Sequence, residues 1–592
     1  AEGRQILANA VGNRPQVQAL LNFVPAGTPN GTFATFNANN QTYLVPLGNL
    51  TGSSSFTFDD HQGSVRLDHR FNDKNLIYGR YRYDYASTAG TGQVTPPGLT
   101  TINDTKTKAA NVVWNSILSA KASNELRVAW SRFDSITGAE DPSSETIPSL
   151  EIPGLGLNGF NAAASRTAIG LAVNLPQFRI NDTYQITDAF TYVAGNHTWK
   201  FGVDLRRTDV KSFFFPTVRG RLVYSSPTGS PVNIQNFIDD IAQTATKNLP
   251  LAGGDTIGFY RWYEYYFFAQ DQWKVTRNFT LSYGVRYEYP GDSFQYLKDL
   301  NTRILSANGN NPAFTLNPVP ETDTDNWMPR IGFNWNPQTS DKGIIGFITG
   351  GDKMVIRGGY SRSYDANFIN INLNVASSFP FVAAQNIPVN GAFVNIQNTT
   401  VPNVAQPNRL VRTVVSEDFR APATDQMSLE MQRELTRDTV MRIGYIRTRG
   451  TGLFQTVDGN PCRPGLNCRG TSFGNRVDPN LETIRLRTNS GSSTYDALQV
   501  SVDKRLSNNF SAGVHYTWST FIDDGSEIFN PSSAEVAVAQ DSFNRRGDRA
   551  RSSYDRPHRF NGNFVYEVAF FKGQNGFAGK LLGGWQVNSL FT

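Results

Sequence analysis

The sequence predicts an all-β protein, more specifically a transmembrane antiparallel β-barrel of about sixteen strands with long extracellular loops. Many segments alternate apolar and polar residues with a period of two, which is the pattern of a strand between two unlike environments. Short turns alternate with long polar connections along the whole chain of 592 residues. The composition, with 12% aromatic residues and 51 glycines, is typical of strands and loops.

The clearest strand pair lies between Arg261 and Pro290. From Phe279 to Tyr289, aromatic and aliphatic residues occupy one parity, while the other parity includes Arg286 and Glu288. The preceding half of the segment ends in a turn of a few residues at 276–278. We therefore expect a hairpin whose two faces differ in polarity.

Two folds would account for such a hairpin. A soluble sandwich buries the apolar parity in its core, whereas an outer-membrane barrel turns it toward lipid and lines its lumen with polar groups. In the barrel, we expect the charged residues of the polar parity to face the lumen, namely Arg286, Glu288, Arg357 and Glu430.

The strands are expected in order along the chain after a long opening segment. Residues 1–58 are low in charge and rich in Asn, Gly and Thr, so we expect a long extracellular loop region with one short helix at Pro15–Phe23. Residues 59–592 are expected to form barrel strands of about ten residues each. Written as pairs that share a short turn, they are 65–71 and 77–85, 106–119 and 125–133, 178–193 and 198–206, 261–275 and 279–289, 330–336 and 353–364, 426–435 and 439–449, 495–506 and 510–519, and 557–570 and 585–592.

The connections between these pairs favour the membrane barrel. Every second connection is long and polar, which places all long loops at one end of the sheet, as in barrels with short periplasmic turns. A soluble sandwich has no reason for this asymmetry. The long connections are 86–105, 134–177, 207–260, 291–326, 365–424, 448–494 and 521–556. Because 585–592 ends within a strand that has no partner after it, we expect the chain to be an internal part of a larger barrel.

Composition and motifs argue against several other classes of protein. The net charge of +5 is small for this length and forms no nucleic-acid-binding module, so no nucleic-acid partner is expected. The sequence has matches to GxGxxG at 154–159 and GxSxG at 470–474, but neither lies in the strand–turn–helix context that its chemistry requires. The five histidines are scattered. We therefore expect no enzymatic activity, no cofactor and no metal site, and we interpret the acidic run 321–326 as a solvated loop rather than a calcium site.

The two cysteines and one basic segment are the remaining candidate sites. Cys462 and Cys468 lie close together in CRPGLNC, with Pro and Gly among the residues between them, which favours a local disulfide, with two free thiols as the alternative. Residues 544–559 are the densest charged segment. Its arginines are candidates for gripping an anionic ligand or lipopolysaccharide phosphates, or alternatively for pairing with nearby aspartates. These candidates are Arg545, Arg546, Arg549, Arg551 and Arg556.

Several of these segments together resemble the barrel of TonB-dependent outer-membrane receptors. The segment YYFFAQDQWKVTRNFTLSYGVRYEY resembles the barrel signature of the Oar-like group, whose members carry a carboxypeptidase-regulatory-like domain and a plug before the barrel. Further segments that resemble this group are GSVRLDHRFNDKNLIYGRYRY, DRPHRFNGNFVYEVAF, LLGGWQVNSLFT and RPQVQALLNFVP. The resemblance implies a fragment of a 22-stranded barrel, and no plug or TonB box can be assigned to any residue here.

The resemblance also implies a location and a function. It implies an outer-membrane receptor of a Gram-negative bacterium that binds a solute at its external loops and imports it through a plug-gated barrel energised by TonB. The alternatives are a structural or surface-interaction protein of the Oar-like type, and a passive porin. The implied partners are outer-membrane lipid and lipopolysaccharide, the TonB complex if the full-length protein has a TonB box, and a surface protein.

Overall fold

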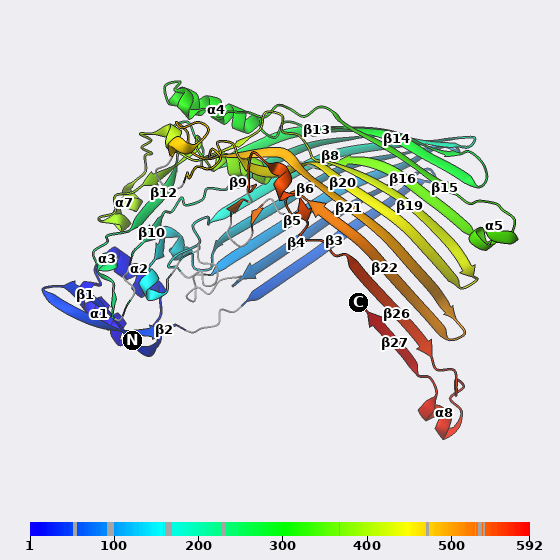
Figure 1. Cartoon of the computed structure of the whole chain (residues 1–592), viewed down its shortest axis with the longest axis horizontal. Coiled ribbons are helices and arrows are strands. Elements are labelled where there is room, and N and C mark those ends of the chain that lie inside the picture. The colour runs from blue at the N-terminus through cyan, green and yellow to red at the C-terminus, as the bar shows by residue number, and fades with distance from the viewer. Residues whose placement is uncertain are drawn as a thin grey trace.

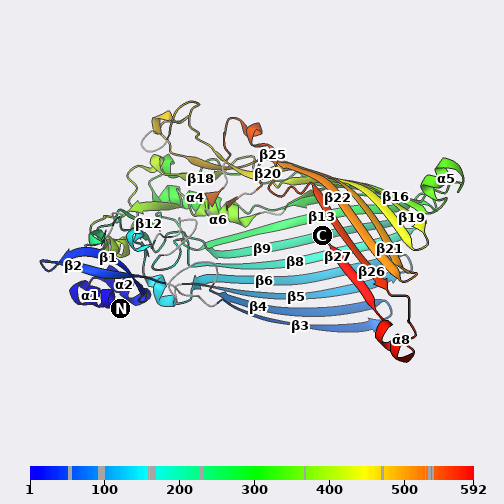
Figure 2. The same cartoon turned by 60° about the horizontal axis from the view of Figure 1, so that its bottom comes forward.

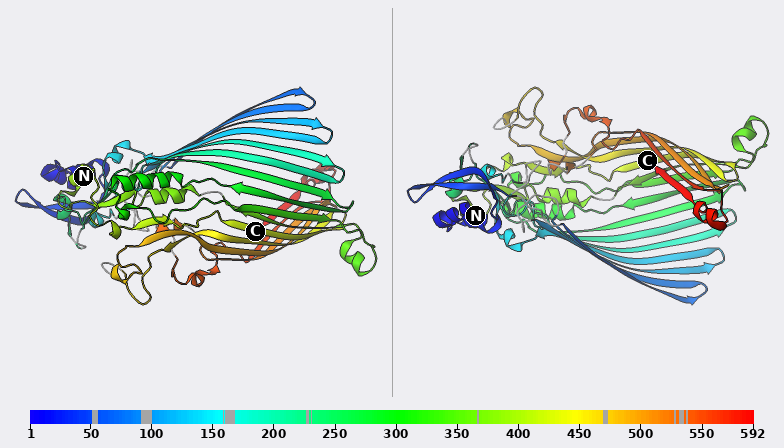
Figure 3. Two further views of the ribbon diagram at one scale, coloured as in Figure 1. Left: turned by 90° about the horizontal axis from the view of Figure 1, so that it is seen from above. Right: turned by 90° about the horizontal axis from the view of Figure 1, so that it is seen from below.

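The computed structural model describes residues 1–50, 56–90, 100–157, 159, 168–225, 229, 231–365, 368–468, 473–526, 529–530, 535–536 and 539–592. Its main feature is one large antiparallel sheet that curves into a barrel wall (Figures 1 and 3). This confirms the predicted all-β membrane-barrel class. Among the described residues, no helix combines the length and apolarity needed to cross a membrane.

Sixteen long strands form the barrel wall, and each is paired with the next long strand along the chain. Two short strands, β18 (Arg412–Val415) and β25 (Ala550–Arg551), are attached to β21 and β22. The long strands are β3 (Thr57–Asn72), β4 (Asn75–Ala89), β5 (Thr101–Ser119), β6 (Ala122–Ala139), β8 (Gln177–Ala194), β9 (His197–Phe213), β13 (Gly258–Lys274), β14 (Phe279–Tyr289), β15 (Asn326–Trp335), β16 (Met354–Tyr364), β19 (Ala423–Thr436), β20 (Thr439–Asp458), β21 (Ile484–Ser507), β22 (Phe510–Asp523), β26 (His558–Glu567) and β27 (Gln586–Phe591).

Many strands are longer than the sequence predicted. Strand β21 has 24 residues and β20 has 20, against about ten expected for a bilayer crossing. The predicted loops 86–105, 207–260 and 448–494 are therefore too long by several residues at each end. The predicted loop 134–177 is too long only at its start, because β6 continues to Ala139 while β8 begins at Gln177. The apolar alternation that marks a strand stops at the edge of the lipid, whereas the backbone hydrogen-bond ladder continues beyond it into polar sequence.

The connections are asymmetric, as predicted. Tight turns join β3 to β4, β5 to β6, β8 to β9, β13 to β14, β19 to β20 and β21 to β22 at one end of the barrel. Two other connections at that end are longer and contain helices α5 (Gly343–Thr349) and α8 (Gly576–Leu582), which lie beyond the strand ends in Figure 1. The long connections lie at the opposite end.

The first 50 residues contain more regular structure than the predicted loop with one helix. Helix α2 spans Pro15–Phe23, the bounds that the sequence predicted. The prediction missed helix α1 (Glu2–Val11) and the hairpin β1 (Thr28–Ala38) and β2 (Gln41–Asn49), which pairs with β11 (Val232–Asn233). The hairpin partner lies almost 200 residues away in sequence, so local composition could not indicate it.

The long connections pack into a folded loop layer with two large hydrophobic cores and a small third one around Leu171 and Leu175, rather than forming only polar loops. The first core joins α1, α2 and the hairpin to α3 (Gln235–Ile238), α7 (Ala392–Asn398) and a four-stranded sheet. The second joins α4 (Gln295–Ala307), α6 (Ile369–Ala376) and β18 to the end of β13 that lies nearest the long connections. The sheet has the order β17 (Val382–Asn386), β12 (Thr244–Pro250), β10 (Arg221–Val223) and β7 (Ser149–Glu151).

The remaining elements are short. A two-stranded pair consists of β23 (Phe529–Asn530) and β24 (Glu535–Val536). The 3-10 helices are η1 (Pro142–Thr146), η2 (Pro153–Leu155), η3 (Pro312–Phe314), η4 (Pro407–Arg409), η5 (Phe473–Asn475) and η6 (Arg545–Asp548).

Candidate functional site: the inner face beneath the loop layer

The side chains of strand β13 point alternately to the two faces of the barrel wall. Tyr260 and Trp262 are 2% and 7% exposed because they pack in the second core with α4 and α6. We call the face that carries these side chains the inner face. On the outer face, Tyr263, Tyr265 and Phe267 are between 42% and 47% exposed. This alternation is what a wall between lipid and a lumen requires.

A polar cluster lies on the inner face around Tyr266, whose side chain is 8% exposed. Its ring centroid lies 5.1 Å from the Arg206 guanidinium and 4.9 Å from that of Arg286, which come from the two neighbouring strands. The Tyr266 hydroxyl donates a hydrogen bond of 2.7 Å to Glu264, and Trp262 Nε1 donates one of 2.6 Å to the same carboxylate. The ring is therefore fixed from two sides and at its tip.

Each arginine of this cluster is also held by a carboxylate. Arg286 lies 2.5 Å from Glu288, and Arg206 lies 2.7 Å from Asp204. Fixed guanidinium and carboxylate groups of alternating sign provide donors and acceptors that a polar solute can exchange for its hydration shell.

The inner face encloses a cavity of about 1040 Å³ next to this cluster. Arg286 and Glu288, two of the charges predicted to face the lumen, are among its lining residues. Its other charged lining residues are Lys200, Asp271 and Arg330. Its uncharged polar lining residues include Gln270, Gln272, Ser282, Ser361, Gln426, Ser428 and Thr448. A polar lining of this kind allows water and small hydrophilic solutes to occupy the space.

The other predicted lumen charges, Arg357 and Glu430, lie opposite each other on β16 and β19. Their nearest charged atoms are 3.9 Å apart, and both side chains are more than a third exposed. An exposed pair at this distance contributes little to stability, on the order of 0–1 kcal/mol.

Most arginines of the predicted cluster at 545–556 have hydrogen-bond or ion-pair partners within the loop layer. Arg549 pairs with Asp524 at 3.2 Å, and Arg551 pairs with Asp555 at 3.2 Å. Arg545 donates hydrogen bonds to Gln455 and Ser490, and Arg556 donates to two backbone carbonyls, those of Ser553 and Asp555. Arg546 lies in η6. Only one of these two ion pairs, that of Arg551, uses an aspartate from the same segment.

The remaining sequence candidates have structural roles or fall outside the described residues. Cys462 and Cys468 are joined by a disulfide. In the acidic run, Asp325 pairs with Arg420 at 2.5 Å and Asp323 accepts the backbone N–H of Ala421. Parts of both glycine motifs lie outside the described residues, namely 158 of the GxGxxG match and 470–472 of the GxSxG match. Elsewhere in the described chain, no group of three or more His, Cys, Asp or Glu side chains is arranged to hold a metal ion.

Buried polar residues fix the loop layer above the inner face. Asp240 accepts hydrogen bonds from the Tyr224 hydroxyl at 2.6 Å and from the backbone N–H of Phe393 at 3.0 Å, and burial raises the pKa of its carboxyl. Arg219 donates to four backbone carbonyls, including those of Leu175 and Ile147, and burial lowers its pKa to about 10. These contacts make the loop layer a preorganised structure.

Sequence reasoning did not identify Tyr266, Glu264 and Arg206 as one site. Strand β13 carries aromatic residues on both faces, so its alternation does not show which rings face inward. The cluster also depends on the register between β9, β13 and β14, which the sequence does not specify. A glutamate between aromatic residues was the one available signal.

Comparison with known proteins supports the architecture described above. A family model described as "Outer membrane beta barrel domain" matches residues 2–592. No curated protein matches the chain. The outer membrane transporter YddB from Escherichia coli has a similar solved structure, with a TM-score of 0.54 and 11% sequence identity over 88% of this chain and 56% of that chain.

Two further solved structures have lower scores. The ferric-catecholate import receptor Fiu from E. coli K12 has a TM-score of 0.42 and 12% identity, covering 88% of this chain and 63% of that one. The FrpB iron transporter from Neisseria meningitidis has a TM-score of 0.43 and 9% identity, covering 92% and 60%. This chain spans less than two thirds of the length of each of the three proteins, and at these identities the likeness is one of fold alone.

Proposed function

The chain belongs to the outer membrane beta-barrel domain family, and from this premise we propose that it is a receptor that binds a solute at its loop layer and admits it through the barrel. The protein resides in the outer membrane of a Gram-negative bacterium. One observation carries the proposal: a folded loop layer stands above a polar inner face with a cavity of about 1040 Å³. A receptor needs a preorganised surface, and a transporter needs a hydrophilic route beneath it.

The finer part of the proposal is energised, gated uptake of the TonB-dependent kind. In this proposal a plug closes the barrel and TonB drives its displacement, with residues 1–58 forming part of an extracellular loop region and 59–592 the barrel. The similarity of the fold to that of the YddB transporter supports the proposal. The inner-face charges Arg286, Glu288, Arg357 and Glu430 would then line the route.

Conductance in planar bilayers tests gating. The conductance of the 592-residue chain would be compared with that of the product of the complete reading frame, with both measured in potassium chloride solution. A gated transporter predicts that the complete product stays closed. Steady conductance by the complete product would instead establish a passive porin, and a reading frame that encodes neither a plug nor a TonB box would overturn TonB-dependent transport.

The Oar-like surface-interaction role is the second candidate, and the β1–β2 hairpin favours it. This hairpin projects from the loop layer in Figure 2 and exposes Phe33 and Leu44, and Leu50 directly after β2 is exposed as well, each being at least 37% accessible. Exposed apolar side chains on a projecting hairpin suit contact with another surface protein. Deletion of residues 29–48 would leave solute uptake intact under this role, and loss of uptake would favour the receptor instead.

A further inference from the structure

A row of polar side chains crosses the inner face of the barrel wall through the cavity of about 1040 Å³. The strand register places each position of the row directly opposite the next, from β9 to β20. Gly284 takes the position on β14, so that strand adds no side chain. We call the six side chains the inner polar row, and all of them line the cavity: Lys200, Gln270, Arg330, Ser361, Gln426 and Thr448.

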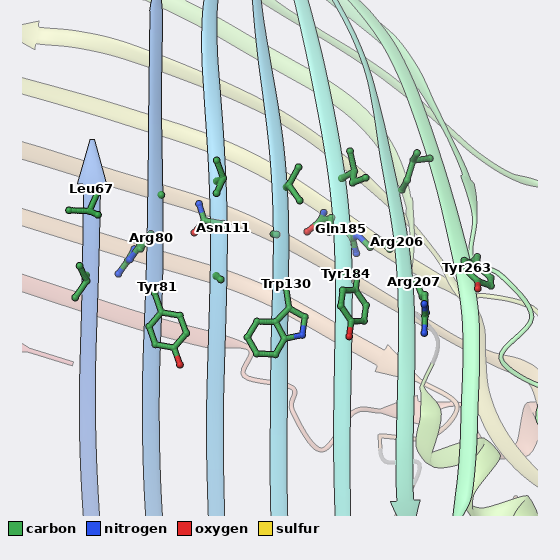
Figure 4. Close-up of a pocket in the computed structure, with 18 of the residues that line it drawn as sticks. Leu67, Arg80, Tyr81, Asn111, Trp130, Tyr184, Gln185, Arg206, Arg207 and Tyr263 are labelled. Carbon is green, nitrogen blue, oxygen red and sulfur yellow. The ribbon is translucent and has the colours of Figure 1, made fainter. Parts of the chain in front are cut away.

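The inner polar row differs from the neighbouring part of the inner face because its polar groups are not used within the wall. Gln185 and Arg206, which lie next to each other in Figure 4, are both bonded to Asp204, at 2.9 and 2.7 Å. In the described part of the chain, no side-chain hydrogen bond or ion pair engages a member of the inner polar row. Polar groups without a protein partner are those that a bound solute can engage.

Cations exceed carboxylates on the inner-face lining of the cavity. Arg286 is paired with Glu288 at 2.5 Å, and the Asp271 side chain points to the opposite face of β13. Lys200 and Arg330 are thus two cations without a carboxylate partner among the described residues. Three strand spacings separate them, which amounts to about 14 Å. They therefore match two separate monoanionic groups better than one phosphate, which carries about two negative charges.

An aromatic ring borders the inner polar row on the side of the loop layer. Phe268 precedes Gln270 by two residues on the same face of β13, and it also lines the cavity. The ring lies against the backbone of Gly202 on β9, because a Cβ atom at this glycine would collide with Phe268 Cε1. The ring is only partly buried, so part of its surface is open to the cavity. An apolar ring beside a few polar groups is typical of a site for a small organic ligand.

The uncharged members of the inner polar row match the hydroxyl groups of a sugar. The amides of Gln270 and Gln426 and the hydroxyls of Ser361 and Thr448 each donate and accept hydrogen bonds. A sugar hydroxyl also donates and accepts, so these partners complement each other. An extended peptide, in contrast, is best matched by the free edge of a sheet, whereas the inner polar row lies on a sheet face.

We propose that the inner polar row binds an oligosaccharide that carries carboxylate groups. Two of its carboxylates lie on Lys200 and Arg330, and one sugar ring packs on Phe268. Its hydroxyl groups bond to the amide and hydroxyl side chains of the row. This ligand class rests on the proposed receptor function and names the kind of solute that the receptor admits.

Isothermal titration calorimetry of the purified 592-residue chain in detergent tests this ligand class, with tetragalacturonate as the probe. This tetramer has a carboxylate on every ring, and its fully methyl-esterified form has the same rings without charge. The parent chain should bind the acidic tetramer at least about tenfold more tightly than the ester, because a hydrogen bond to a charged group contributes about a factor of ten or more. Equal affinity for the two forms, or no binding of the acidic tetramer at millimolar concentration, would overturn the proposal.

A double variant tests the two cations. Lys200→Gln, Arg330→Gln should bind the acidic tetramer only as weakly as the parent chain binds the ester. The matched control Lys121→Gln, Arg277→Gln removes the same charge from two short turns and should bind normally. An equal loss in the control would reduce the effect to net charge. Heat-modifiable migration on gels confirms that each variant is folded, and if the double variant fails this check, the comparison of the two tetramers on the parent chain decides.

Two further measurements test the sugar contacts. Phe268→Leu keeps the apolar bulk without the ring and should weaken the binding of the acidic tetramer and its ester by a similar factor. Unchanged affinity of this variant would overturn the ring contact. Tetraglutamate carries comparable charge on a peptide, and it should bind the parent chain more weakly than tetragalacturonate. Equal affinity for tetraglutamate would show a site for acidic peptides instead of sugars.

The outcome is separable from that of the conductance test of gating. If the parent chain does not bind tetragalacturonate while the complete product stays closed in bilayers, the ligand class is wrong and the gated receptor stands. If tetragalacturonate binds as expected but the complete product conducts steadily, the gated receptor is wrong and the inner polar row is the solute site of a passive porin.

Discussion

Nδ1 of His197 lies 2.6 Å from Oδ2 of Asp271 on the outer face of the barrel near the short turns. Asp271 is 6% exposed and also accepts a hydrogen bond of 3.1 Å from the Tyr283 hydroxyl. Trp273 stacks on the imidazole with ring centroids 5.3 Å apart. A carboxylate at a lipid-facing position is thus covered by aromatic side chains that supply its partners.

Replacement of Asp271 by alanine should destabilise the barrel. The change leaves the Tyr283 hydroxyl and the His197 ring without their partner in a water-poor setting, at a cost of about 1–3 kcal/mol. Unfolding in urea from lipid vesicles measures the free energy. Gln272→Ala on the inner face is the control, and equal losses in both variants would contradict a special role for the pair.

Leu281 tests the assignment of the outer face to lipid. It lies on the apolar parity of β14 and pairs with Trp273 and Phe333 close to the short turns, so Leu281→Arg should cost about 1–2 kcal/mol, less than the roughly 2–4 kcal/mol expected at midplane depth. The neighbouring inner-face change Thr280→Arg should cost much less because that side chain reaches the lumen. Folding yield into vesicles compares the two, and equal yields would show that the faces were assigned the wrong way round.

The sequence predicted the barrel wall well because apolar and polar residues alternate along a strand wherever one of its faces contacts lipid. The hairpin of β13 and β14, with its turn at 275–278, lies where the alternation from Phe279 to Tyr289 placed it. The strand ends were poorly predicted, since the extensions of β20 and β21 are mostly polar and alternate only briefly, as at Ile484 and Leu486.

The loop layer and the polar cluster around Tyr266 could not be predicted from the sequence, for a different reason. Asp240 meets the backbone of Phe393 across 153 residues, and Tyr266 meets arginines from two other strands. Such contacts arise from tertiary packing and register, which local periodicity does not encode.

The Tyr266 cluster predicts graded losses of stability. Tyr266→Phe keeps the ring between Arg206 and Arg286 and loses the bond to Glu264, at a cost of about 0.5–1.5 kcal/mol. Tyr266→Ala also loses both ring contacts, each worth about 0.5–1 kcal/mol or more. Unfolding in urea should rank the wild type above the phenylalanine variant and that above alanine. A phenylalanine variant as unstable as alanine would mean that the ring contacts contribute nothing.

Asp255 predicts an acid-sensitive anchor for helix α4. Its carboxylate lies 2.5 Å from Arg303 and accepts a bond of 2.9 Å from the Tyr296 hydroxyl, and the Arg303 guanidinium holds the pKa of Asp255 below its ordinary value. Because the folded pKa is lowered, the stabilisation is fully present above the ordinary aspartate pKa of about 3.9 and is lost as the pH falls through the lower folded value.

Hydrogen exchange of residues 295–307, corrected for intrinsic rates, measures this anchor at pH 7 and near pH 3. Arg303 is about half exposed, so the free energy of local opening should fall by less than about 1 kcal/mol on acidification. Asp255→Asn should show the weakened anchor already at pH 7 and little further change near pH 3. Asp299→Asn is the matched control, since Asp299 lies on the same helix and bonds only to Gln295 among the described side-chain contacts. If wild type and Asp255→Asn lost the same protection on acidification, the pH dependence would belong to another group, because only an ionised Asp255 can supply the charge that Arg303 binds.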